Sequence, residues 1–315
     1  MKKKEFMQSN GKAAIFLAPF MFNFIVLGMI PLGLGILVTF FKFDIYDFST
    51  LEFRGLDNYF RLFQDNVLAE EFWNAMRITA IFTVVVVPLK IIIPLGLAFL
   101  LSFKPKGYKV FQGILYFPTV ISVSIVGLLF VGIFNDGTEA LFNAFFGTEI
   151  NWLSDNTLRW VVIVMANIWS GTGGNAIILL AAISNVPKSL SEACEADGGN
   201  WWIRFRHVIL PNIKGSLEII LFTSIINSFN LYGLPLVINH PENKYDIVSP
   251  MMLIQSWLSD ANKSKLTGLL TAASIVFGLA IMIVTIIQRS VMNKKKGGNK
   301  YAKRYLEYKA EKEKA

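Results

Sequence analysis

The sequence predicts an all-α polytopic membrane protein with six transmembrane helices, and three observations support this fold class. Hydrophobic residues make up 54% of the 315-residue chain and charged residues only 17%, whereas soluble domains are about a quarter charged. The apolar residues are concentrated in runs that exceed the roughly 20 helical residues needed to cross a bilayer. The polar segments between these runs alternate between basic and acidic, as they do in a chain that crosses a membrane repeatedly.

Six apolar runs are predicted to span the membrane. The predicted spans are residues 13–41, 78–103, 110–134, 158–183, 216–238 and 266–287. The first run follows a lysine-rich start but is longer than a signal-peptide core, so we expect it to be retained as a helix. The spans form a predicted membrane domain over residues 13–290, between a tail of residues 1–12 and a basic tail of residues 291–315.

The charges of the connecting segments predict the orientation of the chain. Lysine and arginine gather in the first tail, in the loops after the second and fourth spans, and in the last tail. Aspartate and glutamate instead predominate after the first and third spans. Because basic segments stay on the cytosolic side, we expect both termini and the loop of residues 185–212 to face the cytosol.

Several functions are disfavoured by residues that the chain lacks. The net charge of +8 comes from basic clusters beside apolar runs, so we expect lipid contact and no nucleic acid. Cys194 is the only cysteine, and His207 and His240 are far apart, so no metal site is expected. The chain has no G-x-x-x-x-G-K-[ST] loop, so we expect neither ATP hydrolysis nor any cofactor in this chain.

The predicted cytosolic loop of residues 185–212 has the signals of two short helices joined by glycine. Pro187 suits a first helical position, and Gly198 or Gly199 can supply the left-handed residue that ends the first helix. Asn200 can cap the second helix, and Pro211 is expected to break it and start the fifth span. The second helix is predicted to be amphipathic, with Arg204 and Arg206 opposite an apolar face formed by Trp201, Trp202, Phe205, Val208 and Ile209. Such a loop is either a docking element or an interfacial helix without a partner.

The same loop carries a family resemblance. Residues 192–211 read EACEADGGNWWIRFRHVILP, which resembles the EAA loop of the permease subunits of ABC importers. Further motifs are similar to the carbohydrate branch of that family, namely FRGLDNY at residues 53–59, YFP at 116–118 and NVP at 185–187. Residues 239–243 read NHPEN and depart from the glycine-rich segment that many sugar permeases carry after the fifth span.

The resemblance implies a type I ABC importer permease in the cell membrane that carries a sugar substrate. It implies a second homologous permease subunit, two cytosolic ATPase subunits that bind the ATP, and an extracytoplasmic substrate-binding protein. In that family the EAA loop lies in a cleft of the ATPase. The resemblance therefore implies an ATPase contact at or near Glu192, Ala193, Asp197 and Gly198, with Leu210 and Pro211 anchoring the loop to the fifth span.

Polar residues inside the spans are candidates for the substrate path, because a bilayer tolerates them only at a cost. Thr223, Asn227 and Asn230 fall on one stripe of the fifth predicted span, where amides and hydroxyls can exchange hydrogen bonds with sugar hydroxyls. Asn167 and Asn175 form a similar stripe in the fourth span, with Gly171 between them. Helix–helix contact is the alternative for both stripes.

Lys90 lies near the middle of the second predicted span, between Pro88 and Pro94. A lone ammonium at that depth costs about 3 kcal/mol on insertion scales. Carbonyls freed by the prolines, or a side chain that extends toward the interface, would explain it without a functional role. The alternative hypothesis is a counter-charge for an anionic sugar.

Two other functions make different demands on the sequence. A secondary transporter driven by an ion gradient would need intramembrane carboxylates and an internal repeat with broken helices, and we expect neither in the six spans. A membrane-embedded enzyme would need a nucleophile–base pair or a metal site at membrane depth. Neither histidine lies in a predicted span and Cys194 has no such partner in sequence, so we expect no catalytic residues.

Overall fold

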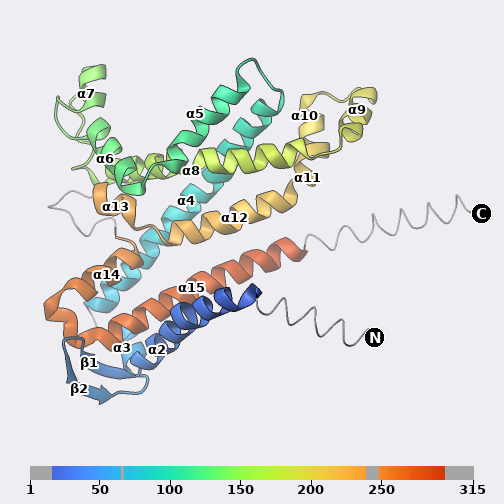
Figure 1. Cartoon of the computed structure of the whole chain (residues 1–315). Coiled ribbons are helices and arrows are strands. Elements are labelled where there is room, and N and C mark those ends of the chain that lie inside the picture. Colours follow the sequence, from blue (N-terminus) through green and yellow to red (C-terminus); the bar gives the residue numbers. More distant parts are fainter. Residues whose placement is uncertain (1–15, 65–66, 239–247, 295–315) are drawn as a thin grey trace, which may run out of the picture. The chain divides into compact units, whose positions relative to one another are not determined.

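The computed structural model describes residues 16–64, 67–238 and 248–294. The predicted tail of residues 1–12, His240 with the NHPEN segment beyond Ile238, and the basic tail beyond Lys294 lie outside the described residues. The described part is mainly helical, which confirms the predicted class (Figure 1). Within it, four helices are long and apolar enough to cross a membrane: Phe16–Val38, Leu68–Ser102, Asn156–Ser184 and Thr267–Met292. Two sharply bent helix pairs raise the number to six if each pair counts as one span.

The chain divides into two units, and the first contains most of the segment between the first and second predicted spans. Its elements are η1 (Phe24–Met29, a π-helix), α2 (Ile30–Val38), β1 (Phe41–Asp44), β2 (Asp47–Phe53), α3 (Asp57–Gln64), η3 (Ala261–Leu266), the first residues of α4 (Leu68–Ser102), the end of α14 (Pro250–Ser259) and the start of α15 (Thr267–Lys294). The strands pair antiparallel, with Phe41 opposite Phe53 and Lys42 opposite Glu52. This hairpin was not predicted from the sequence.

The FRGLDNY motif explains how the hairpin is held. Asn58 is buried and donates from Nδ2 to the carbonyls of Thr39 at 2.8 Å and Phe41 at 2.9 Å. Tyr59 donates its hydroxyl to Thr39 Oγ1 at 2.9 Å. A Cβ at Gly268 would overlap the Phe41 carbonyl, so glycine there lets the start of α15 lie against the same backbone. In the turn, Ser49 donates its hydroxyl and its backbone N–H to the carboxylate of Asp47, which lowers the pKa of Asp47.

The second unit holds the remaining elements. They are most of α4, α5 (Tyr108–Val120), α6 (Val123–Phe134), α7 (Leu141–Phe146), α8 (Asn156–Ser184), α9 (Lys188–Ala196), α10 (Trp201–Ile203), η2 (Arg204–Ile209, a π-helix), α11 (Leu210–Asn212), α12 (Lys214–Phe229), α13 (Gly233–Ile238), the start of α14 and the end of α15. Within this unit α8 packs against α5, α6, α12 and α13. It is therefore the central helix of the unit.

Two predicted spans are not continuous helices. The third, residues 110–134, bends by 101° between α5 and α6. Ile121 and Ser122 are extended there, and the Ser122 hydroxyl accepts from the backbone N–H of Ile125, so serine acts as the N-cap of α6. The fifth, residues 216–238, ends as a helix at Phe229 and resumes as α13. Pro235 lies in the first turn of α13, where a missing N–H costs no helical hydrogen bond.

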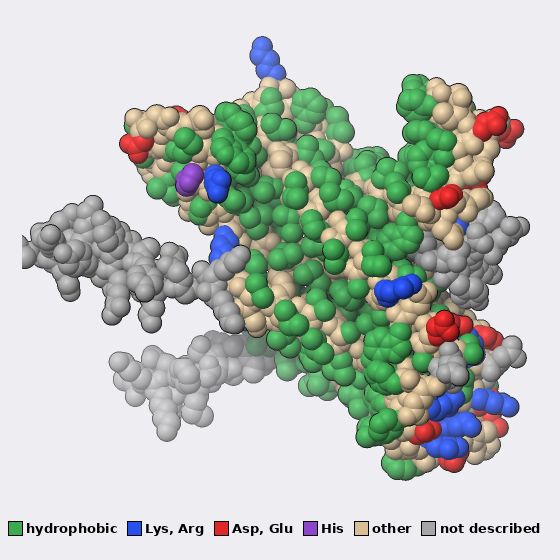
Figure 2. Space-filling model, turned by 180° about the vertical axis from the view of Figure 1, so that it is seen from behind, with side chains coloured by type: hydrophobic (Ala, Val, Ile, Leu, Met, Phe, Trp, Pro, Cys, Tyr) green, Lys and Arg blue, Asp and Glu red, His purple; other side chains and the backbone are tan. Residues whose placement is uncertain are grey.

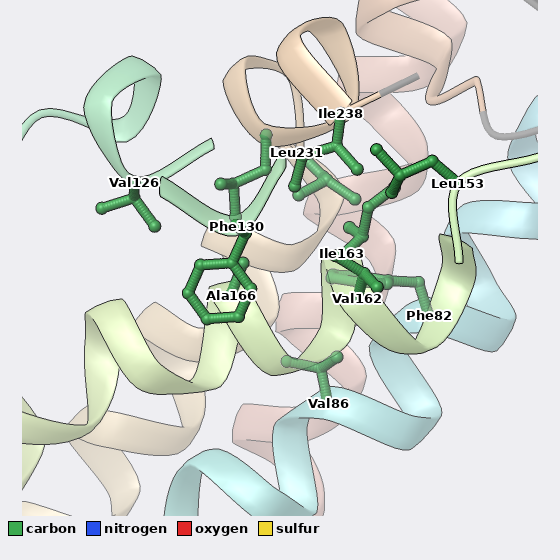
Figure 3. Close-up of a cluster of buried hydrophobic side chains, with 11 residues drawn as sticks. Phe82, Val86, Val126, Phe130, Leu153, Val162, Ile163, Ala166, Leu231 and Ile238 are labelled. Atoms are coloured by element: carbon green, nitrogen blue, oxygen red, sulfur yellow. The ribbon is translucent and has the colours of Figure 1, made fainter. Parts of the chain in front are cut away.

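Buried apolar side chains hold these broken segments together. Figure 3 shows side chains from α4, α6, α8 and the region of α13 converging on one cluster. Its buried members are Phe82, Val86, Val126, Phe130, Leu153, Val162, Ile163, Ala166, Leu231, Leu234 and Ile238. A Cβ at Gly127 of α6 would lie 2.8 Å from the Val237 side chain of α13, so glycine permits this close approach. The helix breaks are therefore fixed by packing.

Large hydrophobic side chains also cover much of the described surface. Figure 2 shows them spread over one face, with acidic and basic side chains gathered in a few places. In the segment Phe16–Val38 none of the most apolar 18-residue window is buried within the chain. Such continuous apolar exposure indicates lipid or partner contact, because soluble surfaces do not expose patches of this extent.

Candidate functional site

The first helix of the loop of residues 185–212 is α9, and its end is closed by backbone hydrogen bonds. Gly198 has φ +77°, and its N–H donates to the carbonyl of Glu195 at 3.0 Å. The N–H of Gly199 donates to the carbonyl of Cys194 at 2.8 Å. This pair of bonds is a Schellman motif, which satisfies carbonyls at a helix C-terminus. The prediction that a left-handed glycine ends this helix is confirmed, and the residue is Gly198.

Gly199 is required for a different reason. A Cβ at this position would overlap both the sulfur and the carbonyl of Cys194. The chain therefore passes back over the last turn of α9 at a distance that only glycine allows. The sequence indicated a glycine turn, but it could not assign separate roles to the two glycines.

The second helix begins where the sequence predicts. Asn200 Oδ1 accepts from the backbone N–H groups of Trp202 at 3.1 Å and Ile203 at 2.9 Å. This is a standard N-cap, which satisfies two of the free donors of a helix start. The helix then continues from α10 through the π-helix η2 into α11.

The prediction that Pro211 breaks this helix is wrong. The helical segment runs to Asn212, and the 70° bend into α12 falls at Ile213. The turn before Pro211 is wide, because Leu210 donates its N–H to Phe205, five residues back. A turn of this width leaves space for the ring of Pro211, and its hydrogen bonding does not use the N–H group that proline lacks. The sequence could not show this change from α-helical to π-helical hydrogen bonding.

The loop is anchored to the membrane helices through an apolar cluster. Ile209 and Ile213 are each 1% exposed and belong to a buried cluster with residues of α4 and α8. The ring of Phe205 lies 4.8 Å from that of Phe99 in α4, centroid to centroid. Arg204 Nη1 lies 3.4 Å from Glu195 Oε1 and thereby joins the two helices of the loop. The predicted amphipathic packing is realised through Phe205 and Ile209, while Trp201 and Trp202 remain exposed.

The residues at which the family resemblance predicts an ATPase contact lie on the surface of this anchored loop. Glu192, Ala193, Asp197 and Gly198 are exposed. Glu192 also borders a hollow of about 290 Å³ between α9, η2 and the ends of α4 and α8, together with Glu195 and Arg204. Leu210 is half-buried and Pro211 exposed, next to the buried Ile209. The loop is thus fixed on one side and accessible on the other.

A second polar region lies where α8 meets α4. Pro94 has no N–H, so the carbonyl of Lys90, four residues earlier in α4, lacks its helical partner. Asn175 of α8 replaces that partner, donating from Nδ2 to the Lys90 carbonyl at 3.1 Å. The proline-freed carbonyl near Lys90 is therefore occupied by an amide and not by an ammonium.

The Lys90 side chain is directed to the same face of α8. It is 7% exposed, and its Cε and Nζ lie 3.3 and 3.4 Å from where a Cβ of Gly171 would stand. Asn167 precedes Gly171 by one helical turn, and its Oδ1 is buried without a hydrogen-bond partner in the described residues. We call Lys90, Asn167, Gly171 and Asn175 the polar stripe. The structure thus brings Lys90, a candidate from the second predicted span, next to the candidate stripe of the fourth predicted span.

Helix–helix contact, the alternative considered for this stripe, is found at Gly171 and Asn175 against α4, and the next two glycines pack more tightly still, against α5. A Cβ at Gly173 would overlap the backbone carbonyl of Leu115 in α5. Gly174 donates its N–H to Thr119 Oγ1 at 3.1 Å. These glycines form the crossing of α5 and α8, while Gly171 lies against Lys90 of α4.

The polar residues of the predicted fifth span are divided by its break. Thr223 and Asn227 are exposed on α12, while Asn230 is the exposed residue that ends the helix. Thr223 donates its hydroxyl to the carbonyl of Ile219 at 3.0 Å.

The expectation of spans without carboxylates needs a correction, because Glu218 falls within residues 216–238. It lies in the second turn of α12, 4.0 Å from Lys214.

Among the described residues no group of three or more His, Cys, Asp or Glu side chains is arranged to hold a metal ion. His207 is exposed, with Nδ1 3.2 Å from the carbonyl of Ile203.

Comparison with known proteins identifies the class. The model of the family described as "Binding-protein-dependent transport system inner membrane component" matches residues 90–296, which is more than half of the chain. The chain belongs to this family. Its members are transport components, which agrees with the expectation that the chain is a membrane permease and not an enzyme.

Several curated relatives are similar over most of their length. The chain is 28% identical over 294 residues to the probable starch degradation products transport system permease protein AmyD of Thermoanaerobacterium thermosulfurigenes, covering 91% of this chain and 96% of that protein. It is 28% identical over 291 residues to the arabinooligosaccharides transport system permease protein AraP of Bacillus subtilis, covering 90% and 89%. The lactose transport system permease protein LacF of Rhizobium radiobacter is 36% identical over 183 residues, covering 56% and 59%.

The fold of this chain is also found among solved structures of known proteins. A chain of a bacterial ABC transporter involved in the import of the acidic polysaccharide alginate superposes with a TM-score of 0.76 at 18% identity, covering 93% of this chain and 99% of that one. The fold is therefore that of an ABC importer permease. No comparison supports the ion-gradient transporter.

Proposed function

We propose that this chain is the membrane-spanning subunit of an ATP-driven importer that moves a sugar or oligosaccharide into the cell. One observation carries the proposal: the family match over residues 90–296 includes the whole loop of residues 185–212, which here folds as a capped and anchored pair of helices. Relatives named for starch degradation products, arabinooligosaccharides and lactose support the substrate class.

In this proposal the loop transmits movement from separate ATPase subunits to the membrane helices. Glu192, Ala193, Asp197 and Gly198 contact the ATPase from the exposed side of the loop. Movement passes through the Arg204–Glu195 pair and the buried cluster around Ile209 to α4, α8 and α12. The helices then rock between inward-open and outward-open states, which is rigid-body switching about packed elements.

The proposal includes further subunits. A second, homologous permease subunit completes the translocation path, two cytosolic ATPase subunits bind and hydrolyse ATP, and an extracytoplasmic binding protein delivers the ligand. One structural neighbour is described as a complex with an alginate pentasaccharide-bound periplasmic protein, which illustrates that arrangement for that transporter. Sugar hydroxyls in transit bond to amide groups of Asn227 and Asn230, beside Thr223, and to the half-buried Asn167 and Asn175.

The test uses the assembled transporter in proteoliposomes, with its binding protein outside and ATP inside. Glu192→Lys reverses a charge at the proposed contact, and we expect uptake to fall about tenfold, equivalent to about 1.4 kcal/mol of interface energy. Lys109→Glu is the matched control, because it reverses an exposed charge in the other predicted cytosolic loop. Co-purification of the ATPase and the rate of ATP hydrolysis are measured alongside uptake.

Two results would contradict the proposal. Saccharide uptake by the chain alone, driven by an ion gradient and indifferent to ATP, would replace it with secondary transport. Wild-type uptake by Glu192→Lys with the ATPase still bound would remove this loop from the coupling role.

A further inference from the structure

Lys90 is a buried cation for which the described chain provides no counter-charge. Its side chain is 7% exposed, and none of the ion pairs or hydrogen bonds of the described residues involves its ammonium. The described carboxylates of the second unit are confined to residues 136–155, to residues 192–197 and to Glu218 in the second turn of α12. An isolated charge in an apolar interior is costly unless something pairs with it.

The two explanations without a functional role do not fit the geometry. The carbonyl that Pro94 frees is paired with Asn175, and within the described residues the ammonium bonds neither to it nor to the carbonyl of Val84, which Pro88 frees. Lys90 also lies 12 residues before the end of α4 at Ser102, which is about 18 Å along a helix and beyond the reach of a lysine side chain. Its Nζ instead packs against Gly171, the position of α8 that lacks a side chain.

Asn167, the neighbouring polar residue of α8, is chemically complementary to Lys90, but no hydrogen bond joins the two side chains within the described residues. Asn167 Oδ1 is buried and accepts no hydrogen bond from the described chain, so it requires a donor. Lys90 requires an acceptor, and a charged acceptor is the strongest. An acidic sugar offers both groups on one molecule, because its hydroxyls donate and its carboxylate or phosphate accepts.

We infer that the polar stripe is a subsite for the anionic group of the transported saccharide, with Lys90 as its counter-charge and Asn167 as an acceptor for an adjacent hydroxyl. This inference rests on the proposed saccharide transport and narrows it to acidic substrates. Lys90 acts as a specificity residue and takes no part in ATP coupling. A neutral sugar leaves the ammonium unpaired in transit and is carried less well.

The experiment varies the charge on the protein and on the substrate together. The complete transporter, with its binding protein, is tested for ATP-driven uptake of paired acidic and neutral probes. The pairs are trigalacturonate with its methyl ester, glucuronic-acid-substituted xylotriose with xylotriose, and glucose 6-phosphate with glucose. The variants are Lys90→Met, which keeps the length of the side chain, and Lys90→Arg, which keeps its charge. Lys109→Met, at an exposed position in α5, is the matched control.

The wild-type transporter is expected to prefer the acidic member of at least one pair. Lys90→Met is expected to lose uptake of that member by about 30-fold or more, which is the range for losing one partner of a buried charge pair. Uptake of the neutral member should change less than about twofold, since it makes no charge contact. Lys90→Arg and Lys109→Met should retain the acidic preference.

Three results would overturn the inference, and they differ in what they leave standing. A preference for neutral probes that Lys90→Met does not alter would show that the saccharide transporter is right and the anionic subsite wrong. Equal loss of both members in Lys90→Met, with weakened co-purification of the second permease subunit, would make Lys90 an interface residue that pairs with that subunit. If the intact transporter moves none of the probes with ATP, the proposed saccharide function fails and the inference with it.

Discussion

The loop of residues 185–212 and the polar stripe are the two polar regions that the proposed function uses, and they are built in different ways. The turns and helix ends of the loop are closed by hydrogen bonds between near neighbours, such as the bonds of Asn200 to residues two and three positions later. The stripe depends on contacts between distant segments, such as the Asn175–Lys90 bond across 85 residues. A locally closed element can transmit force as a unit, whereas a polar site inside a bilayer exists only where two helices place it.

The largest expected effect comes from forcing α5 away from α8, the helix that carries three residues of the polar stripe. Gly173→Ala puts a Cβ into the Leu115 carbonyl, so α5 and α8 have to move apart. Overpacking of this kind costs about 1–3 kcal/mol, and a backbone obstacle places this variant at the upper end. The assembled transporter should unfold at a lower temperature in a thermal scan and should lose uptake of every substrate.

Gly113→Ala is the control for that variant, because it changes another glycine of the same crossing pair of helices where a Cβ meets nothing within 4 Å. It should be neutral or slightly stabilising, since alanine is a better helix former than glycine. Equal unfolding temperatures for the two variants would mean that the α5–α8 crossing tolerates a Cβ at Gly173.

A smaller effect is expected in the loop. Gly198→Ala forces a residue with a Cβ to keep φ +77°, which costs about 1–2 kcal/mol. The end of α9 should fray, so the Gly199 amide, which bonds to Cys194, should exchange its hydrogen faster. Because the substitution leaves the proposed ATPase subunits unchanged, ATP hydrolysis should continue while the sugar imported per ATP falls. Gly215→Ala, in the first turn of α12 with open space around it, should preserve that ratio.

What could be predicted from the sequence follows the same division between local and long-range contacts. The Gly198 turn and the Asn200 cap were predictable, because each depends on the conformational or hydrogen-bonding preference of one residue. The shift of the break from Pro211 to Ile213 was not, because a π-helical turn upstream accommodates the proline. The helix breaks at Ser122 and after Phe229 also escaped, since hydropathy records the apolar length of a run and not its direction.

The candidate path residues show this limit most clearly. Lys90, Asn167 and Asn175 each stood out as polar residues in apolar runs, but nothing local indicated that they meet. Their meeting depends on α8 crossing α4 at Gly171, and no residue spacing within one helix encodes that crossing. The β1–β2 hairpin was missed for the same reason, because its support comes from Asn58 bonding back to Thr39 and Phe41.

The N-cap of α10 offers a milder perturbation of the loop. Asn200→Ala removes the oxygen that accepts from Trp202 and Ile203, at a cost of about 1 kcal/mol. We expect faster hydrogen exchange at those two amides and a modest fall in uptake per ATP. Asn200→Asp keeps an acceptor of equal capping strength and should behave as the wild type. If both variants exchange alike, the cap does not order the second helix.

The smallest expected effect is at the bond that joins the stripe to α4. Asn175→Ala removes the donor to the Lys90 carbonyl, and hydrogen bonds between membrane helices average about 0.6 kcal/mol. The Lys90 carbonyl is free only because Pro94 has no N–H to donate to it. The cost of Asn175→Ala therefore depends on Pro94. Pro94→Ala restores the N–H that α4 lacks, so Asn175→Ala should destabilise the otherwise wild-type transporter and be nearly neutral when combined with Pro94→Ala. Chemical unfolding of the wild type, the two single variants and the double variant measures that coupling. Equal costs of Asn175→Ala with and without the proline would mean that Asn175 stabilises the crossing through packing and not by replacing the missing helical bond.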